Sequence, residues 1–117
     1  MATVTATLLP SQTLTLNRVK WAALGGSDVG SAVGMADYQD RTIQVIGTFG
    51  GATVTIQGSN DDATTWATLT DPLGNALTFS TAGMKQITEL PQYIRPSVAG
   101  GTGSAIDVYL HMRGRDQ

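Results

Sequence analysis

The amino-acid sequence predicts an all-β protein, an antiparallel β-sandwich or jelly-roll-like fold of about eight short strands. No long stretch repeats its apolar residues with helical spacing, whereas short segments that alternate apolar and polar residues recur along the chain. Clusters of Gly, Asn, Asp, Ser and Pro separate these segments and are typical of turns. Because 117 residues is the size of one domain with one core, we expect a single sandwich domain over residues 1–117 with an extended N-terminal segment.

The first part of the chain alternates in two phases. Near the N-terminus, apolar side chains lie opposite a row of threonines, which are Thr3, Thr5 and Thr7. Past Asn17 the phase changes, so that Val19, Trp21 and Ala23 form the apolar face of the next strand. This change of phase predicts a bulge, or a strand that bends from one sheet to the other.

The strongest local pattern predicts a β-hairpin. Residues 43–49 and 52–58 alternate apolar and polar side chains on either side of Gly50-Gly51, and two glycines suit the positive φ angles of a two-residue turn. The apolar side chains of both strands then share one face, with Gly47 opposite Val54. Because one register places the apolar side chains of both strands on the same face, this pairing is favoured.

Shorter alternating runs predict the remaining strands, at residues 66–69, 77–80, 85–90, 93–98 and 106–112. Turn-forming residues separate them, notably at 59–62 and 71–75. Pro91 and Pro96 flank one of these strands, and because proline lacks a ladder donor we expect it to be very short or to lie on a sheet edge. The last strand has an apolar face and a polar row, which is Asp107, Tyr109, His111 and Arg113.

The composition excludes several classes of function. Charged residues make up 14% of the sequence, the net charge is −2 and the pI is about 5.0. So few basic residues predict no binding to nucleic acid, and the absence of cysteine excludes disulfides and thiolate metal sites. No apolar run is long enough for a membrane span and no signal-peptide pattern begins the chain. We therefore expect a soluble protein that folds in a cytoplasm and has no membrane contact.

Groups for catalysis are too sparse for an enzyme. His111 is the only histidine, and Asp107 on the same strand is about 13 Å away at the rise of a strand, too far to form a catalytic set. Glu89 is the only glutamate and the aspartates cluster in turns, which argues against the paired carboxylates of a glycosidase. We expect no catalytic residue, no cofactor and no metal.

Two features allow a second interpretation. The oxygens of Asn60, Asp61, Asp62 and Asp71 are of the type that binds calcium, although turns in which these side chains bond their own backbone explain the same residues and are favoured. Trp21 and Trp66 are predicted to pack in the core. The alternative for either tryptophan is an exposed platform on which a sugar stacks.

The low charge and the Thr-rich faces favour contact with other proteins. Aromatic and guanidinium side chains are enriched at interfaces. The candidate interface residues are Thr3, Thr5, Thr7, Tyr93, Arg95, Tyr109, His111 and Arg113. Because an unpaired strand edge can pair with another chain, we also expect contacts from residues 2–9 or from the Gly-rich loop 25–40, which is predicted to contain a short strand around Val33.

Part of the sequence resembles a known family. The run from Gly47 to Asp61, followed by Trp66, residues 69–77 and Tyr93-Ile94-Arg95-Pro96, is similar to small structural proteins encoded in the head-gene modules of tailed bacteriophages, of the capsid decoration (cement) type. The resemblance covers about residues 40–100. It implies a virion protein on the capsid exterior, a homo-oligomer that is often a trimer, with the major capsid protein as partner. It assigns no binding residue.

Two other functions are compatible with the same sequence. One is a carbohydrate-binding or adhesive sandwich module of a phage tail or fibre, which uses Trp21, Trp66 or Tyr93 for stacking. The other is a tail-tube or connector subunit, which assembles into rings.

Overall fold

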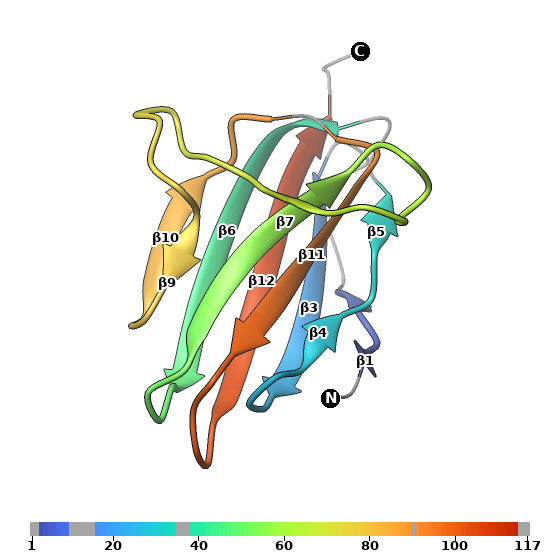
Figure 1. The fold of residues 1–117 in the computed structure, drawn as a ribbon. Coiled ribbons are helices and arrows are strands. Elements are labelled where there is room, and N and C mark those ends of the chain that lie inside the picture. The colour runs from blue at the N-terminus through green and yellow to red at the C-terminus, as the bar shows by residue number, and fades with distance from the viewer. Residues whose placement is uncertain (1–2, 10–15, 35–37, 90, 115–117) are drawn as a thin grey trace.

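The chain folds into two β-sheets that face each other across one core (Figure 1). The computed structural model describes residues 3–9, 16–34, 38–89 and 91–114. Among these residues the strands are β1 (Thr3–Val4), β2 (Thr7–Leu9), β3 (Leu16–Leu24), β4 (Val29–Gly30), β5 (Val33–Gly34), β6 (Tyr38–Thr48), β7 (Thr53–Ser59), β8 (Ala67–Thr68), β9 (Thr78–Phe79), β10 (Gly83–Gln86), β11 (Tyr93–Ala99) and β12 (Ala105–Gly114). The predicted all-β sandwich is confirmed. The strands outnumber the predicted eight because several have only two residues.

Each sheet has a defined strand order. The seven-stranded sheet runs β1-β4-β11-β7-β8, with β5 paired to β11 and β9 paired to β7. The five-stranded sheet runs β10-β6-β12-β3-β2. Every pairing is antiparallel except that of β1 with β4, which is parallel. No helix that could span a membrane occurs among the described residues.

The predicted hairpin of residues 43–58 is wrong, because β6 and β7 belong to different sheets. β6 pairs with β10 and β12, whereas β7 pairs with β11, β8 and β9. The connection is a corner between the layers, in which Ala52 N donates to Phe49 O at 2.9 Å. Its glycines have positive φ angles, of 121° at Gly47, 57° at Gly50 and 88° at Gly51. Two strands that face each other across a core alternate in the same way as two strands of one hairpin, so the pattern could not separate the two cases.

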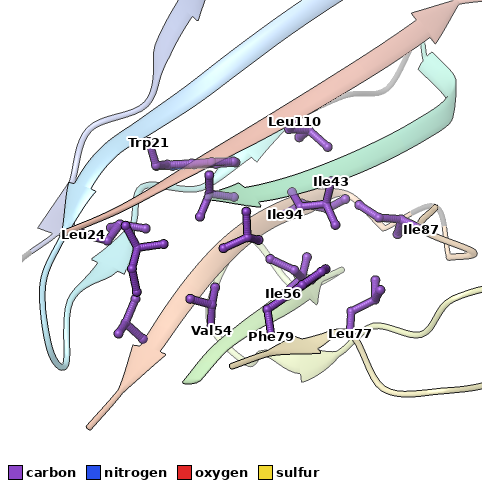
Figure 2. Packing of buried hydrophobic residues seen from close by; sticks show 14 of the residues in the cluster. Trp21, Leu24, Ile43, Val54, Ile56, Leu77, Phe79, Ile87, Ile94 and Leu110 are labelled. Carbon is purple, nitrogen blue, oxygen red and sulfur yellow. The ribbon is translucent and has the colours of Figure 1, made fainter. Parts of the chain in front are cut away.

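The apolar faces of both sheets form the core (Figure 2). The five-stranded sheet contributes Val19, Trp21, Leu24, Ile43, Val45, Ile106, Val108, Leu110 and Met112. The seven-stranded sheet contributes Val29, Val54, Ile56, Phe79, Ile94 and Val98, and the connecting segments add Ala52, Leu69, Leu77 and Ile87. The predicted alternation of the last strand is confirmed, since its apolar row is buried and its described polar row is not.

Trp21 is the largest side chain of the core and has no exposed surface. Its indole Nε1 donates to the carbonyl oxygen of Ser31 at 2.9 Å, which satisfies the one polar group of the ring. Gly30 lies against the ring, because a Cβ at Gly30 would be 2.5 Å from Trp21 Cδ1 and 2.6 Å from Pro96 Cδ. The prediction that Trp21 packs in the core is confirmed.

Strand β3 contains a bulge, but it lies near Ala23 and not past Asn17, where the change of phase predicted one, since Asn17, Arg18 and Val19 pair in regular register with β12. The apolar face of β3 also differs from the prediction at Ala23. The pairing of β12 with β3 shifts register between Ile106 and Val108. Ala23 has a φ of 56° and is exposed, and its N–H donates to Asp107 Oδ1 at 2.9 Å. Leu24 takes the core position instead. The bulge turns the strand by one residue, so the period of two fails at this point.

Strand β11 is central, which corrects the prediction of an edge strand or a very short strand. It lies between β4 and β7 and is seven residues long. Pro96 is opposite Ile56, whose N–H donates to Leu77 O and whose carbonyl oxygen accepts from Leu69 N, both at 2.9 Å. The backbone of Ile56 thus points away from β11, and its partner in an antiparallel pair points away from β7. Pro96 therefore occupies a position that needs no ladder donor toward β7.

The N-terminal segment connects the two sheets at one edge of the sandwich. β1 pairs with β4, and β2 pairs with β3. Between them, Ser31 N donates to Val4 O at 2.8 Å and Ala6 N donates to Ser31 Oγ at 2.9 Å. These pairings and hydrogen bonds satisfy backbone groups on one side of the segment within the same chain. In the Gly-rich region 25–40, the short strand predicted around Val33 is β5, which pairs with β11.

Candidate functional site

The structure distributes the predicted interface residues over three surfaces. Tyr93 and Arg95 lie on the outer face of the seven-stranded sheet, whereas Tyr109 and His111 lie on the outer face of the five-stranded sheet. Thr3, Thr5 and Thr7 are exposed along the segment that joins the sheets. Arg113 belongs to β12, and its side chain lies outside the described ones. The predicted residues therefore do not form one site.

Strand register brings three of them together on one face of the five-stranded sheet. One row crosses all five strands and consists of Met84, Gln44, Tyr109, Lys20 and Thr7. The adjacent row contains Gln86, Thr42, His111 and Arg18. We call these nine residues the Tyr109 face. Opposed residues of neighbouring strands share a face, so Thr7, Tyr109 and His111 belong to the same surface.

The Tyr109 face combines aromatic, apolar and paired charged groups. Lys20 Nζ lies 5.2 Å from the centre of the Tyr109 ring and 3.7 Å from Asp107 Oδ2. A hydrogen bond with Tyr109 and the charge of Asp107 raise the pKa of Lys20. Met84 is 59% exposed, and together with Tyr109 and His111 it borders a shallow hollow of about 320 Å³. An exposed thioether beside an aromatic ring is typical of an adaptable protein contact.

A second surface lies at one end of the seven-stranded sheet and contains Trp66. A groove of about 480 Å³ borders the indole ring. We call it the Trp66 groove, and its lining residues are Gly58, Ser59, Asn60, Asp61, Thr65, Trp66, Ala67, Thr68, Leu69, Glu89 and Pro91. Trp66 is half-buried and is not part of the core cluster. The prediction that Trp66 packs in the core is therefore wrong, because β8 exposes both of its residues and leaves the preceding ring on the outer surface.

Arg95 holds the Trp66 ring from one side. Its guanidinium carbon is 4.2 Å from the ring centre, a cation–π contact, and its Nε donates to Gln57 Oε1 at 2.9 Å. Partial burial lowers the pKa of Arg95. Arg95 is not among the residues that line the groove. The stack fixes the ring orientation without filling the groove.

The loop 59–65 forms one wall of the Trp66 groove. Asp61 Oδ1 accepts from Ser59 Oγ at 2.7 Å and from Thr65 N at 2.9 Å. The backbone N–H of Thr65 and then the Ser59 hydroxyl lower the pKa of Asp61 to about 2. The predicted turn, in which an acidic side chain bonds its own backbone, is confirmed here. It is also confirmed at Asp71, whose Oδ1 accepts from Leu73 N at 3.0 Å and from Asn75 N at 2.9 Å.

Gln92 ties this loop to the start of β11. Asn60 Oδ1 accepts from Gln92 N at 2.7 Å. The side-chain amide of Gln92 donates to Asp62 Oδ1 at 2.9 Å and accepts from Asp62 N at 3.0 Å. Three hydrogen bonds across two segments hold the wall in one conformation.

Glu89 also lines the Trp66 groove. Its Oε1 accepts from Thr70 N at 2.8 Å, and its Oε2 accepts from the Thr70 hydroxyl. Burial acts to raise the pKa of Glu89, but the hydrogen bonds from Thr70 outweigh it, and the pKa is lowered. Arg41 donates to the carbonyl oxygen of Glu89 at 3.1 Å, which anchors the backbone at the same point.

The groove therefore presents anionic acceptors and an aromatic ring. Because the pKa values of both Asp61 and Glu89 are lowered, both are ionised at neutral pH, and neither is a proton donor of the kind that acid catalysis of glycoside cleavage requires. No Lys, Arg or His is among the lining residues. The arrangement suits binding through hydrogen bonds and ring contact. Sequence reasoning selected Arg95 but did not connect it with Trp66, since the pairing depends on the register of β7, β8 and β11.

The Asp61 turn predicts a dependence of stability on acid. Because its folded pKa of about 2 lies below the ordinary value of 3.8, the ionised carboxylate stabilises the fold above that ordinary value, and this contribution is lost as the pH falls from about 4 to 2. Asp71 and Glu89 shift in the same direction. We expect the free energy of unfolding, measured by urea denaturation at pH 7, 4, 3 and 2, to fall over this range.

Asp61→Asn isolates the contribution of this one turn. The variant should be less stable at pH 7 and should have a shallower slope between pH 4 and 2. Ser59→Ala removes one donor to Asp61 and should make the slope shallower by a smaller amount, while the loss of the bonds from Asp61 N and Ala63 N to its hydroxyl lowers stability at every pH. An unchanged slope in Asp61→Asn would show that the turn does not cause the acid sensitivity.

Comparison with known proteins supports the fold alone. No family model and no curated protein matches the chain. The crystal structure of the SPBc2 prophage-derived protein YomS is similar with a TM-score of 0.63 at 8% identity, over 88% of this chain and 99% of that one. KdgF from Halomonas sp. has a TM-score of 0.43 at 14% identity, over 95% and 79% of the two chains. The K1 cleaved adhesin domain of Lys-gingipain from Porphyromonas gingivalis W83 has a TM-score of 0.42 at 11% identity, over 95% and 91%. The last two scores are too low to carry an argument.

Proposed function

We propose that this chain is a bacteriophage virion protein of the capsid decoration type. In this proposal it assembles as a homotrimer and binds the outer surface of the capsid, where subunits of the major capsid protein meet. Each contact is weak, and repetition over a regular lattice multiplies the affinity. The protein has no catalytic role, since the carboxylates of the Trp66 groove are not poised as proton donors.

The Tyr109 face is the observation that carries the proposal. The row that crosses the five-stranded sheet has neutral side chains apart from Lys20, and Lys20 is engaged by Tyr109 and Asp107. The Tyr and Met of this row are residue types enriched at interfaces. The similarity to YomS, a prophage-derived protein, spans nearly all of that chain and supports a phage origin. The resemblance of residues 40–100 to phage head proteins supports the capsid.

Localisation on the particle tests the proposal directly. Particles purified from cultures that carry the gene would be labelled with antibody to the chain and imaged by electron microscopy. Label over the capsid shell is the expected result. Label confined to tails, or particles that lack the chain by mass spectrometry, would overturn the capsid assignment.

Met84→Lys is expected to weaken assembly, because it replaces an exposed apolar side chain of the Tyr109 face with a charge. Light scattering of the native chain should give about three times the 12.2 kDa of one chain. The variant should raise the dissociation constant at least about tenfold, measured by sedimentation velocity over a dilution series. Leu73→Lys is the matched control, since Leu73 is 86% exposed and lies outside the Tyr109 face. A monomeric native chain, or equal effects of both substitutions, would contradict the assigned contact.

A further inference from the structure

We propose that the Trp66 groove binds a neutral saccharide. This inference goes beyond the proposed function, because the groove lies on the opposite sheet from the Tyr109 face and stays accessible when that face is covered. Both activities can therefore belong to one protein and can be tested separately.

Trp66 lies outside the core cluster and borders the groove. Trp66 is half-buried, so part of its indole ring is open to a ligand. Arg95 is anchored on Gln57 and fixes the ring from one side. A ring held in place loses little conformational entropy when a ligand packs on it.

The lining of the groove matches the chemistry of a sugar. A pyranose ring has a face of C–H groups, which packs on an aromatic ring, and a rim of hydroxyls, which donate and accept hydrogen bonds. The groove offers the indole of Trp66 beside the hydroxyls of Thr65 and Thr68 and the carboxylates of Asp61 and Glu89. Its volume of about 480 Å³ lies within the range of small-molecule sites.

The charge of the lining residues selects among saccharides. The lining residues include two carboxylates and no cation. The lowered pKa values keep both carboxylates ionised at neutral pH. A phosphorylated sugar, a uronic acid or a sialic acid would be repelled, whereas the hydroxyls of a neutral sugar can donate to these oxygens. The hydrogen bonds of Asp61, Asn60 and Gln92 hold the acceptors in place before a ligand arrives.

Tryptophan fluorescence provides a direct measurement. The chain has two tryptophans, and Trp21 has no exposed surface, so a change in emission when sugar is added reports on Trp66. Lactose, maltotriose and chitotriose would be titrated to about 10 mM, together with a wider array of neutral glycans. We expect at least one to change the emission saturably, and sialyllactose to bind more weakly than lactose.

Variants decide whether the groove is the site. Trp66→Ala should weaken binding by at least about tenfold, measured by calorimetry, and Trp66→Phe should retain part of the affinity. Thr68→Arg fills the groove from an exposed strand position and should abolish binding while the melting temperature stays unchanged. Tyr93→Ala is the control, because Tyr93 is an aromatic residue on the same sheet that does not line the groove. Failure of every neutral glycan to bind, a preference for acidic glycans, or binding that survives both Trp66→Ala and Thr68→Arg would overturn the proposal.

Discussion

Replacing Trp21 with alanine is expected to lower the free energy of unfolding by about 3–5 kcal/mol. The side chain is fully buried between the sheets, and it donates a hydrogen bond to Ser31 O. The variant would leave a cavity lined by rigid neighbours, since Gly30 and Pro96 belong to strands that are paired on both sides of the site. Such a loss is a large part of the free energy of unfolding of a typical domain, which is about 5–15 kcal/mol. Urea denaturation at pH 7, followed by circular dichroism, measures it.

Trp66→Ala is the matched control, because it removes the same side chain from the outer surface. Removing the Trp66 ring eliminates only its contact with Arg95 and a partly buried surface. We therefore expect the free energy of unfolding to fall by about 1 kcal/mol or less. Trp21→Phe should fall between the two, because it keeps most of the packing and leaves the Ser31 carbonyl without the indole donor. Equal losses for Trp21→Ala and Trp66→Ala would contradict the assignment of one tryptophan to the core and the other to the surface.

The class of fold was predictable because strand periodicity is a local property of the sequence. In β12 the buried Ile106, Val108 and Leu110 alternate with exposed or half-exposed neighbours, as expected from their spacing alone. Turn chemistry is equally local, and the Asx turns at Asp61 and Asp71 form where the sequence predicts them. Features that depend on a few neighbouring residues could therefore be read from the chain.

Features that depend on which strands are neighbours could not be predicted in this way. The expectation for Pro96 assumed that every central strand needs a donor at every residue, whereas the register with Ile56 places the proline where no donor toward β7 is needed. Ala23 leaves the core because the bulge in β3 allows Leu24 to enter it. Both outcomes follow from pairing between distant segments.

The Trp66 groove shows the same limit for a candidate site. The sequence singled out Trp66 as a core residue or a stacking platform and Arg95 as an interface residue, but it contains no signal that the two side chains stack. That contact arises because β11 and β8 lie on either side of β7. Asp61 and Glu89 likewise meet at one groove only through the fold.

Gly47→Ala distinguishes the observed corner from a hairpin, because the two arrangements predict effects of opposite sign. In a regular hairpin strand, alanine in place of glycine would stabilise the protein by about 0.5–1 kcal/mol. In the observed structure Gly47 has a φ of 121°, and a Cβ there would collide with the carbonyl oxygen of Ala105 and lie 3.1 Å from Ile106 Cα. Both obstacles are backbone atoms of the paired strand β12, which cannot move aside without breaking the ladder. We therefore expect a loss of about 3 kcal/mol.

Gly51→Ala separates the two causes of that loss. Gly51 also has a positive φ, of 88°, but a Cβ there would meet nothing within 4 Å. This variant has backbone strain alone and should lose only about 1 kcal/mol, so the difference between the two variants measures the collision with β12. Urea denaturation of both variants beside the native chain gives the two values. A Gly47→Ala protein as stable as the native chain would mean that Gly47 does not lie in this conformation against β12, and the pairing of β6 with β12 at this residue would then be lost.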